Sequence, residues 1–99
     1  MHSFELLKVL VPVKKSLKCR ENDDFLIVTN RTQNIYYLND TARYIYENCD
    51  GERTIGSIFE ILCNEYNILE DQYAEVKEDL VSMIRDFQWQ QIIELWGSK

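Results

Sequence analysis

The hydrophobic positions of the chain follow two different spacings. Between residues 15 and 38, apolar and polar residues alternate over short runs that are separated by polar turns. From residue 40 onward, apolar residues recur at every third or fourth position instead. Alternation is typical of strands and the longer interval is typical of helices. The sequence therefore predicts strands first and helices afterwards.

Three short strands are predicted before residue 39, at 17–20, 25–29 and 34–38. The polar residues between them allow tight turns, which favours an antiparallel meander. In a sequential meander the third strand lies at an edge, where half of its N–H and C=O groups have no partner strand. Along this strand, Leu38 and Tyr36 share one face, and Ile35 and Tyr37 share the other. We expect Leu38 to point into the core.

Three helices follow, each with its own start signal. Asn39 or Asp40 can cap the first helix, and we expect Gly51 to end it in a left-handed conformation. Thr54 can cap the second helix, and an acidic pair at the start of the third favours its amino-terminal end. The predicted core faces of the three helices are Ala42, Ile45, Tyr46 and Cys49; Ile55, Ile58, Phe59 and Leu62; and Tyr73, Val76, Leu80, Met83, Ile84 and Phe87.

Both ends of the chain are also apolar. Because Pro12 bars a helix through the first fourteen residues, we expect residues 1–14 to form an extended arm. This arm would pack over the domain formed by residues 15–99, or over a second copy of it. Trp89, Ile92, Ile93, Leu95 and Trp96 are expected to form a turn and a short strand that close the core.

Together these elements predict an α+β fold of the winged helix-turn-helix type, in which a three-stranded antiparallel sheet precedes three helices. The third helix also carries a mixed stripe beside its core face, made of Tyr73, Lys77, Val81 and Ile84. Two interpretations of this stripe stay open. It can pack beneath the amino-terminal arm, or it can form one wall of a groove.

Composition narrows the range of functions. The 99 residues suffice for one domain with its own core. Eleven basic and seventeen acidic residues give a net charge of −6, and the basic residues are scattered along the chain. Such a balance opposes binding to a phosphate backbone. The predicted second helix, which would be the recognition helix of a DNA-binding protein, has no Lys or Arg between residues 54 and 66.

The sequence shows none of the spacings typical of catalysis or metal binding. Its three cysteines, Cys19, Cys49 and Cys63, lie too far apart for a zinc site, and the only histidine is His2. No glycine-rich phosphate loop is present, and Asp50 is best interpreted as a corner residue between two helices. We therefore expect a protein that is not an enzyme and needs no metal or cofactor. Without a membrane-spanning run or a signal peptide, we expect it in the cytoplasm.

Several short patterns in the chain resemble the PqqD family. These patterns are Leu38-Asn39, Ala42 and Ile45, Cys49-Asp50-Gly51, Arg53-Thr54-Ile55 and Ile58, and further on Asp79-Leu80, Met83-Ile84, Phe87 and Ile92-Ile93. The resemblance covers residues of roughly 25 to 93, and it rests on the order and spacing of the patterns together. Gln91 stands where the family usually has Gly.

The resemblance implies a non-catalytic recognition domain for ribosomally made precursor peptides. Such a domain holds the leader part of a precursor as an added strand and presents the core part to a modifying enzyme, often a radical S-adenosylmethionine enzyme and sometimes a cyclase or a leader peptidase. On this basis the peptide-binding residues are expected to be Asn34, Ile35, Tyr36, Tyr37, Tyr73, Lys77, Leu80, Val81 and Ile84.

Two other functions remain open from the sequence. The first is a winged-helix DNA-binding regulator, which the fold permits and the charge disfavours. The second is a structural subunit that forms a homodimer through the apolar arm without binding a peptide. The sequence names neither the precursor, nor the modification, nor the oligomeric state.

Overall fold

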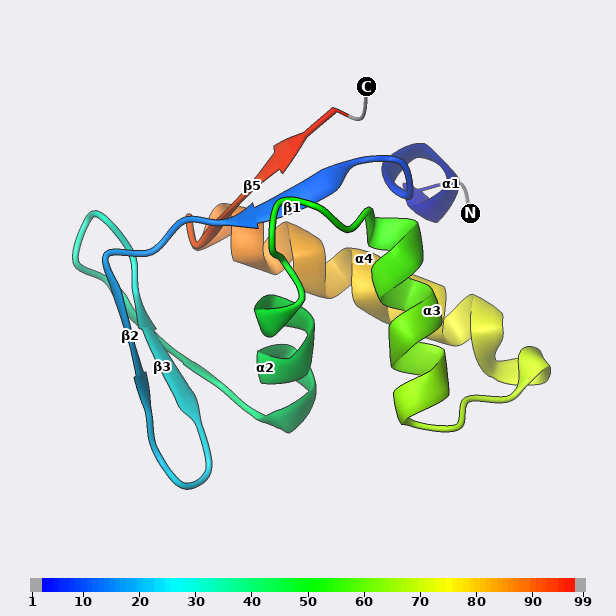
Figure 1. Cartoon of the computed structure of the whole chain (residues 1–99), viewed down its shortest axis with the longest axis horizontal. Coiled ribbons are helices and arrows are strands. Elements are labelled where there is room, and N and C mark those ends of the chain that lie inside the picture. The colour runs from blue at the N-terminus through cyan, green and yellow to red at the C-terminus, as the bar shows by residue number, and fades with distance from the viewer. Residues whose placement is uncertain (1–2, 98–99) are drawn as a thin grey trace.

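The computed structural model describes residues 3–97 and has the predicted α+β winged helix-turn-helix plan, with one additional strand pair and one additional short helix (Figure 1). A single 3-10 turn, Glu70–Gln72, leads into the last helix. The helices and strands are α1 Ser3–Leu7, β1 Val11–Lys14, β2 Lys18–Glu21, β3 Leu26–Thr29, β4 Ile35–Leu38, α2 Asp40–Glu47, α3 Ile55–Glu65, α4 Tyr73–Trp89 and β5 Ile93–Trp96.

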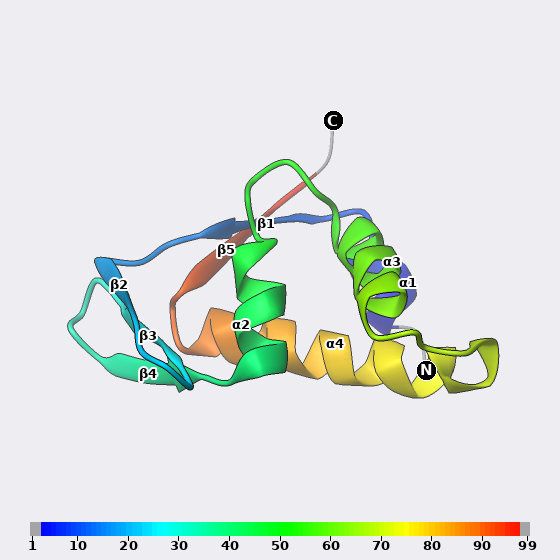
Figure 2. The same ribbon diagram turned by 60° about the horizontal axis from the view of Figure 1, so that its bottom comes forward.

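Strands β2, β3 and β4 form the predicted antiparallel meander, which we call the wing. Their order in the sheet is β2-β3-β4, so β4 lies at an edge as the sequence predicted. Leu38 faces Leu26 across β4 and β3, and both are buried. The wing projects from one end of the molecule, and β4 leads from it directly into α2 (Figure 2).

The helix starts follow the predicted caps. The Asn39 side chain accepts a hydrogen bond from the amide of Ala42 at 3.1 Å, and Thr54 Oγ1 accepts one from the amide of Ser57 at 3.1 Å. The predicted stop was wrong in one detail. Gly51 has a φ of +81°, but α2 already ends at Glu47, so Gly51 instead turns the chain into the corner that leads to α3.

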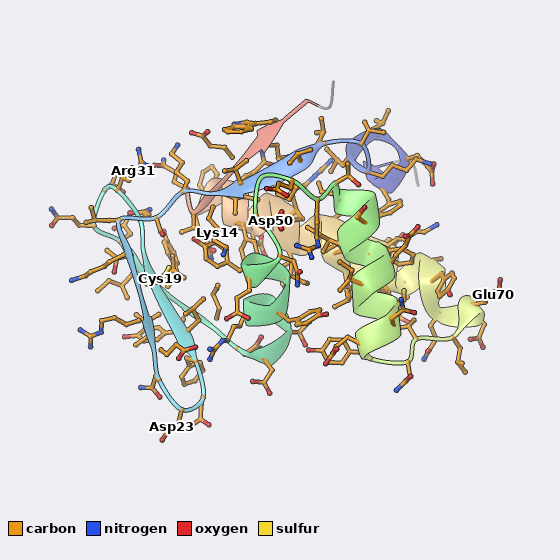
Figure 3. The ribbon with its side chains drawn as sticks, viewed as in Figure 1. Lys14, Cys19, Asp23, Arg31, Asp50 and Glu70 are labelled. Atoms are coloured by element: carbon orange, nitrogen blue, oxygen red, sulfur yellow. The ribbon has the colours of Figure 1, made fainter. Side chains whose placement is uncertain are left out.

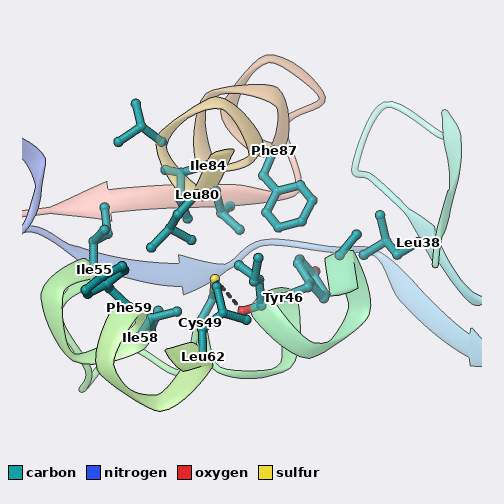
Figure 4. Close-up of a cluster of buried hydrophobic side chains, with 14 of the residues drawn as sticks. Leu38, Tyr46, Cys49, Ile55, Ile58, Phe59, Leu62, Leu80, Ile84 and Phe87 are labelled. Atoms are coloured by element: carbon teal, nitrogen blue, oxygen red, sulfur yellow. Dashed lines mark hydrogen bonds between the residues drawn. The ribbon is translucent and has the colours of Figure 1, made fainter. Parts of the chain in front are cut away.

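The core lies between α2, α3 and α4, with β1 and β5 closing one side (Figure 4). The rings of Tyr46 and Phe87 meet edge to face with their centroids 5.6 Å apart. Cys49 Sγ donates to the carbonyl of Ile45 at 3.3 Å, so it behaves as a small buried side chain. The helical residues that the pattern placed on the core faces are buried or half-buried here.

The amino-terminal segment differs from the predicted extended arm. Residues 3–7 form the short helix α1, because Pro12 lies beyond this helix and prevents only its continuation. Strand β1 then pairs with β5. On its other side, β1 bonds to the corner after α2, through Gly51 N–H to Pro12 O at 3.1 Å and Lys14 N–H to Cys49 O at 3.1 Å. The segment therefore packs on its own chain.

The carboxyl-terminal segment forms the predicted short strand β5, and Ile92 and Ile93 help to close the core. The expectation for the two tryptophans was wrong. Trp89 is 88% exposed and Trp96 is 52% exposed. The periodicity of α4 gives the reason, since the buried positions are Leu80, Val81, Ile84 and Phe87, and Trp89 falls about 200° around the helix from Phe87.

Candidate functional site

The outer edge of β4 has backbone groups available for pairing. The N–H of Asn30 donates to the carbonyl of Asn34 at 2.9 Å, and hydrogen-bonded pairs alternate along an antiparallel ladder. With the register of β3 and β4, the N–H and C=O groups of Ile35 and Tyr37 therefore point away from β3. Within residues 3–97, no strand lies on that side of β4.

Two further strand edges are open in the described part of the chain, and they differ from β4. The outer edge of β2 carries Lys18, Arg20 and Glu21, and charged side chains are a common protection against strand pairing. β5 has β1 on one side only and contains Glu94. Only β4 combines an open edge with a run of uncharged side chains, Ile35 to Leu38.

Beside the open edge, the outer face of the wing carries an apolar patch, which we call the outer patch: Phe25, Ile27, Ile35 and Tyr37. Tyr37 is 64% exposed and Ile35 is 55% exposed. The rings of Phe25 and Tyr37 meet edge to face, with their centroids 5.9 Å apart. Tyr37 also lies directly across from Ile27. A strand added to β4 would place its own outward side chains beside this patch.

Asn30 fixes the turn that precedes β4. Its side chain is buried. Its Oδ1 accepts hydrogen bonds from the amides of Thr32 and Asn34, at 3.0 and 2.9 Å, and from Thr32 Oγ1 at 2.9 Å. Its Nδ2 donates to the carbonyl of Gln90 at 2.7 Å. One buried amide therefore joins the β3–β4 turn to the carboxyl-terminal end of α4.

A groove of about 740 Å³ runs between α1 and α4, and we call it the α1–α4 groove. Figure 3 places Glu70, at one end of it, on the side of the molecule opposite the wing. The groove is open and has a mixed lining of apolar, acidic and basic side chains. Its lining residues are Phe4, Glu5, Glu70, Tyr73, Ala74, Lys77, Glu78, Val81, Ser82 and Arg85.

Phe4 fixes α1 against α3 and the start of α4. Its ring meets the ring of Phe59 edge to face at 5.3 Å, and Phe59 meets Tyr73 in the same way at 5.4 Å. Lys77 Nζ lies 5.1 Å from the centroid of Phe4 and 5.4 Å from that of Phe59, within range for a cation–π interaction. The mixed stripe of α4 thus combines both interpretations that the sequence left open, since Lys77 packs on α1 and Tyr73, Lys77 and Val81 line the groove, whereas Ile84 is buried in the core.

The structure divides the predicted peptide-binding residues into three sets. Asn34, Ile35, Tyr36 and Tyr37 lie on the wing, with Ile35 and Tyr37 outward and Tyr36 half-buried on the inner face. Tyr73, Lys77 and Val81 line the α1–α4 groove. Leu80 and Ile84 are fully buried, so they support the groove from beneath. Their roles in peptide binding remain predictions.

Sequence reasoning missed three residues of this region: Phe4, Phe25 and Asn30. Phe25 was assigned to a strand, but its contact with Tyr37 depends on the strand register. Asn30 was placed in a turn, and its partner Gln90 lies 60 positions away.

The corner between α2 and α3 is structural. Asp50 Oδ1 accepts hydrogen bonds from the amides of Glu52 and Arg53, both at 3.0 Å, and Oδ2 forms an ion pair with the Arg53 guanidinium. Desolvation raises the pKa of Asp50, but these amides and the guanidinium outweigh it, so the net shift is downward. A carboxylate held charged in this way is suited to fixing a turn rather than to transferring a proton.

Burial raises the pKa of the Cys49 thiol to about 12, so it is not an activated nucleophile. Within residues 3–97, no three His, Cys, Asp or Glu side chains come together as a metal site, and His2 lies outside this range. None of the helices described is long and apolar enough to cross a bilayer.

Comparison with known proteins agrees with this geometry. The family model described as "Coenzyme PQQ synthesis protein D (PqqD)" matches residues 24–93. This range contains β3, β4 and the helices α2 to α4, and it excludes β2 and most of β5. No curated protein and no solved structure matches the chain. The chain therefore belongs to the PqqD family, whose members are non-catalytic, peptide-binding partners in biosynthesis.

Proposed function

We propose that this protein binds the leader segment of a ribosomally synthesised precursor peptide as a fourth strand on β4 and presents it to a modifying enzyme. The observation that carries the proposal is the open edge at Ile35 and Tyr37, with the outer patch beside it. Recognition by strand addition needs both features, because backbone hydrogen bonds give affinity and side-chain contacts give specificity. The family match supports β4 over the other open edges, since it contains all of β4.

The size of the edge is consistent with reversible binding. Ile35 and Tyr37 together offer four backbone groups, worth about 1 kcal/mol each. Two or three apolar side chains of the peptide would add about 1.5–3 kcal/mol each. Association and ordering cost about 4–15 kcal/mol. The gain and the cost are of similar size, so binding is reversible and no tighter than about the micromolar to sub-micromolar range, which suits delivery followed by release.

The partner in this proposal is an enzyme that acts on the peptide core, such as a radical S-adenosylmethionine enzyme, a cyclase or a leader peptidase, in the cytoplasm. The recognition protein itself supplies no cofactor and no catalytic group. A DNA-binding role has less support. The buried face of α3 packs into the core, and its exposed residues include Glu60 and Glu65 and no basic side chain.

The test is an amide-shift titration of the full chain with precursor peptides encoded near its gene. We expect shifts in residues 34–38 and none in β2. Tyr37→Pro removes one outward N–H without removing a bond to β3, and it should weaken binding at least tenfold. Cys19→Pro is the matched control, because Cys19 faces Val28 and directs its own N–H to the opposite edge of the wing.

If Tyr37→Pro and Cys19→Pro bind peptide equally well, the β4 edge is not the site. If residues 34–38 show no shift with any of these precursors, leader recognition by strand addition is excluded for this protein.

A further inference from the structure

Strand β2 adds two basic side chains to the outer face of the wing, beside the outer patch. Arg20 lies directly across from Ile27, and Ile27 lies across from Tyr37. Lys18 lies across from Thr29. Residues directly opposite each other in a sheet share a face. Lys18 and Arg20, which we call the basic pair, therefore point to the same side as the outer patch, and both are exposed.

The charge of the basic pair is not compensated within the described chain. The structure gives no ion pair for Lys18 or Arg20 within residues 3–97. Most of the other basic residues form an ion pair or lie over an aromatic ring: Lys8, Lys14, Lys15, Arg43, Arg53 and Lys77. The basic pair is thus a local excess of positive charge on a chain whose net charge is −6.

The strands present no acidic side chain on this face. The outward positions of β2, β3 and β4 are two basic and four uncharged residues: Lys18, Arg20, Ile27, Thr29, Ile35 and Tyr37. The acidic strand residue Glu21 points inward, across from the buried Leu26, and forms an ion pair with Arg43 of α2. An apolar surface flanked by unpaired cations is complementary to a partner surface that combines apolar and acidic side chains.

We propose that the outer face of the wing is the docking surface for the modifying enzyme, which contacts it with an acidic surface. The basic pair forms ion pairs with that surface, and the outer patch supplies the apolar contact. This inference rests on the proposed function, because that function supplies the partner. The leader and the enzyme then occupy different parts of the wing, the leader at the edge of β4 and the enzyme on the face of the sheet.

The width of the face indicates a folded partner rather than the leader itself. Neighbouring strands lie about 4.8 Å apart, so a strand added to β4 would lie about 14 Å from β2. Side chains stand roughly perpendicular to a sheet, and at this separation they cannot form an ion pair. A single added strand therefore leaves the basic pair unpaired, whereas a folded surface laid across β2, β3 and β4 covers it.

The size of the face indicates a weak contact that a bound leader strengthens. Three strands of four residues give a face of about 10 Å by 13 Å, well below the roughly 800 Å² per partner of a stable interface. Contact with this face alone should therefore be weak. An added leader strand widens the face, so we expect the enzyme to bind the peptide-loaded protein more tightly than the empty one.

Protection of an open strand edge is the other role of charged residues on β2. A charge of either sign protects an edge, whereas docking of an acidic surface requires positive charge. Reversing the charge of Lys18 and Arg20 therefore separates the two roles.

The test measures binding of the full chain, with and without precursor peptide, to the modifying enzyme encoded beside its gene. We expect binding to weaken with added salt and to fall at least tenfold in Lys18→Glu/Arg20→Glu. Lys18→Arg/Arg20→Lys keeps the charges and should bind as the wild type does. The matched control is Lys8→Glu/Lys15→Glu, which changes the net charge equally and breaks only surface ion pairs that contribute little to stability.

Two further measurements locate the effect on variants whose folding is verified by circular dichroism. Charges about 14 Å apart are largely screened at physiological salt, so Lys18→Glu/Arg20→Glu should bind the leader with wild-type affinity and show the same amide shifts at 34–38. In the wild-type complex, cross-saturation from the enzyme should reach the amides of Arg20 and Ile27. It should not reach Ala74 and Ser82, which line the α1–α4 groove.

Equal effects of the two double charge reversals, or enzyme binding that does not respond to salt, would overturn the inference. Failure of every modifying enzyme encoded near the gene to bind would also overturn it. Retardation of a DNA duplex that is lost in Lys18→Glu/Arg20→Glu would assign the face to nucleic acid instead. If leader shifts at 34–38 persist, these results leave the proposed function intact. If the enzyme docks on the face and no precursor shifts residues 34–38, the docking face is supported and leader recognition is not.

Discussion

At the scale of single residues, Gln91 has a strained backbone conformation that lowers the stability of the fold. It has a φ of +60° at the turn between α4 and β5, in the left-handed region that favours glycine. A left-handed non-glycine residue costs about 1–2 kcal/mol, and glycine gives part of this back through its greater freedom in the unfolded chain.

We therefore expect Gln91→Gly to raise the free energy of unfolding by about 0.5–1 kcal/mol, measured by urea denaturation. The matched control is Gln88→Gly, which places the same substitution inside α4 and should lower stability by about 1 kcal/mol. If both substitutions destabilise the protein equally, the strain assigned to Gln91 is absent.

The raised pKa values of two buried residues, Tyr46 and Cys49, predict how the free energy of unfolding changes at alkaline pH. Burial raises the pKa of Cys49 to about 12 and that of Tyr46 to about 12. Both groups are neutral when protonated, and their pKa values in the folded state are higher than their ordinary values of 9.0 for Cys49 and 10.0 for Tyr46. Their contribution to stability is therefore complete below pH 9 and is lost as the pH rises toward 12.

We expect the free energy of unfolding to fall steadily between pH 9 and 12, with Cys49 alone contributing a loss on the order of 4 kcal/mol over that range. Urea denaturation at half-unit pH steps measures this. Cys49→Ala lowers stability at neutral pH but should flatten the alkaline slope. An unchanged slope in this variant would show that Cys49 does not cause the loss.

At the scale of elements, Asn30 connects the wing to α4, and removing its side chain should loosen β4. Asn30→Ala leaves the amides of Thr32 and Asn34 and the carbonyl of Gln90 without their side-chain partner. We expect a loss of about 2–3 kcal/mol in stability. The Tyr36 amide, on the inner side of β4, should also exchange faster with solvent.

Hydrogen exchange followed by NMR distinguishes this role from general destabilisation. Thr32→Val is the control, because it removes one hydroxyl from the same turn and leaves the link to Gln90 in place. If the two variants accelerate exchange in β4 to the same degree, Asn30 acts only within its turn.

These elements also show what the sequence could predict. Strands β3 and β4 and the starts of α2 and α3 follow from alternation and from caps within three residues of each other, which are local interactions. Helix α1 could not be predicted in this way, because five residues do not form a stable helix alone. Its position depends on Phe4 meeting Phe59, a contact between residues far apart in the sequence.

The candidate site likewise has one part that follows from local sequence patterns and another that depends on contacts between distant residues. The open edge of β4 and the outward direction of Ile35 and Tyr37 follow from strand order and alternation, so the sequence predicted them. The groove depends on where α1 lies, and the position of the wing relative to α4 depends on the bond between Asn30 and Gln90. The stripe of Tyr73, Lys77, Val81 and Ile84 therefore had two interpretations until the fold placed α1 beside it.

At the scale of the whole molecule, the net charge favours peptide recognition over DNA binding. The net charge is −6, and α3, the helix that would enter a DNA groove, presents acidic rather than basic side chains. We expect no retardation of a random 30-base-pair duplex in a gel shift at low salt, where phosphate contacts are strongest. Retardation that disappears with added salt would return the DNA-binding regulator to consideration.

The position of the amino-terminal arm, residues 1–14, determines whether the protein is expected to be a monomer or a dimer. Phe4 is buried on its own body, and the carbonyls of Lys8 and Leu10 accept hydrogen bonds from the amides of Gly56 and Ile55, both at 2.9 Å. Because these groups are satisfied within one chain, exchange of the arm between two copies would gain no new contact.

We expect light scattering to give the monomer mass from 10 µM to 1 mM, the usual concentration range for detecting weak dimers. Deletion of residues 1–12 should lower stability, because it removes Phe4 and part of β1. A dimer that forms with the full chain and disappears on this deletion would show instead that the arm is exchanged, and the α1–α4 groove would then be built from two subunits.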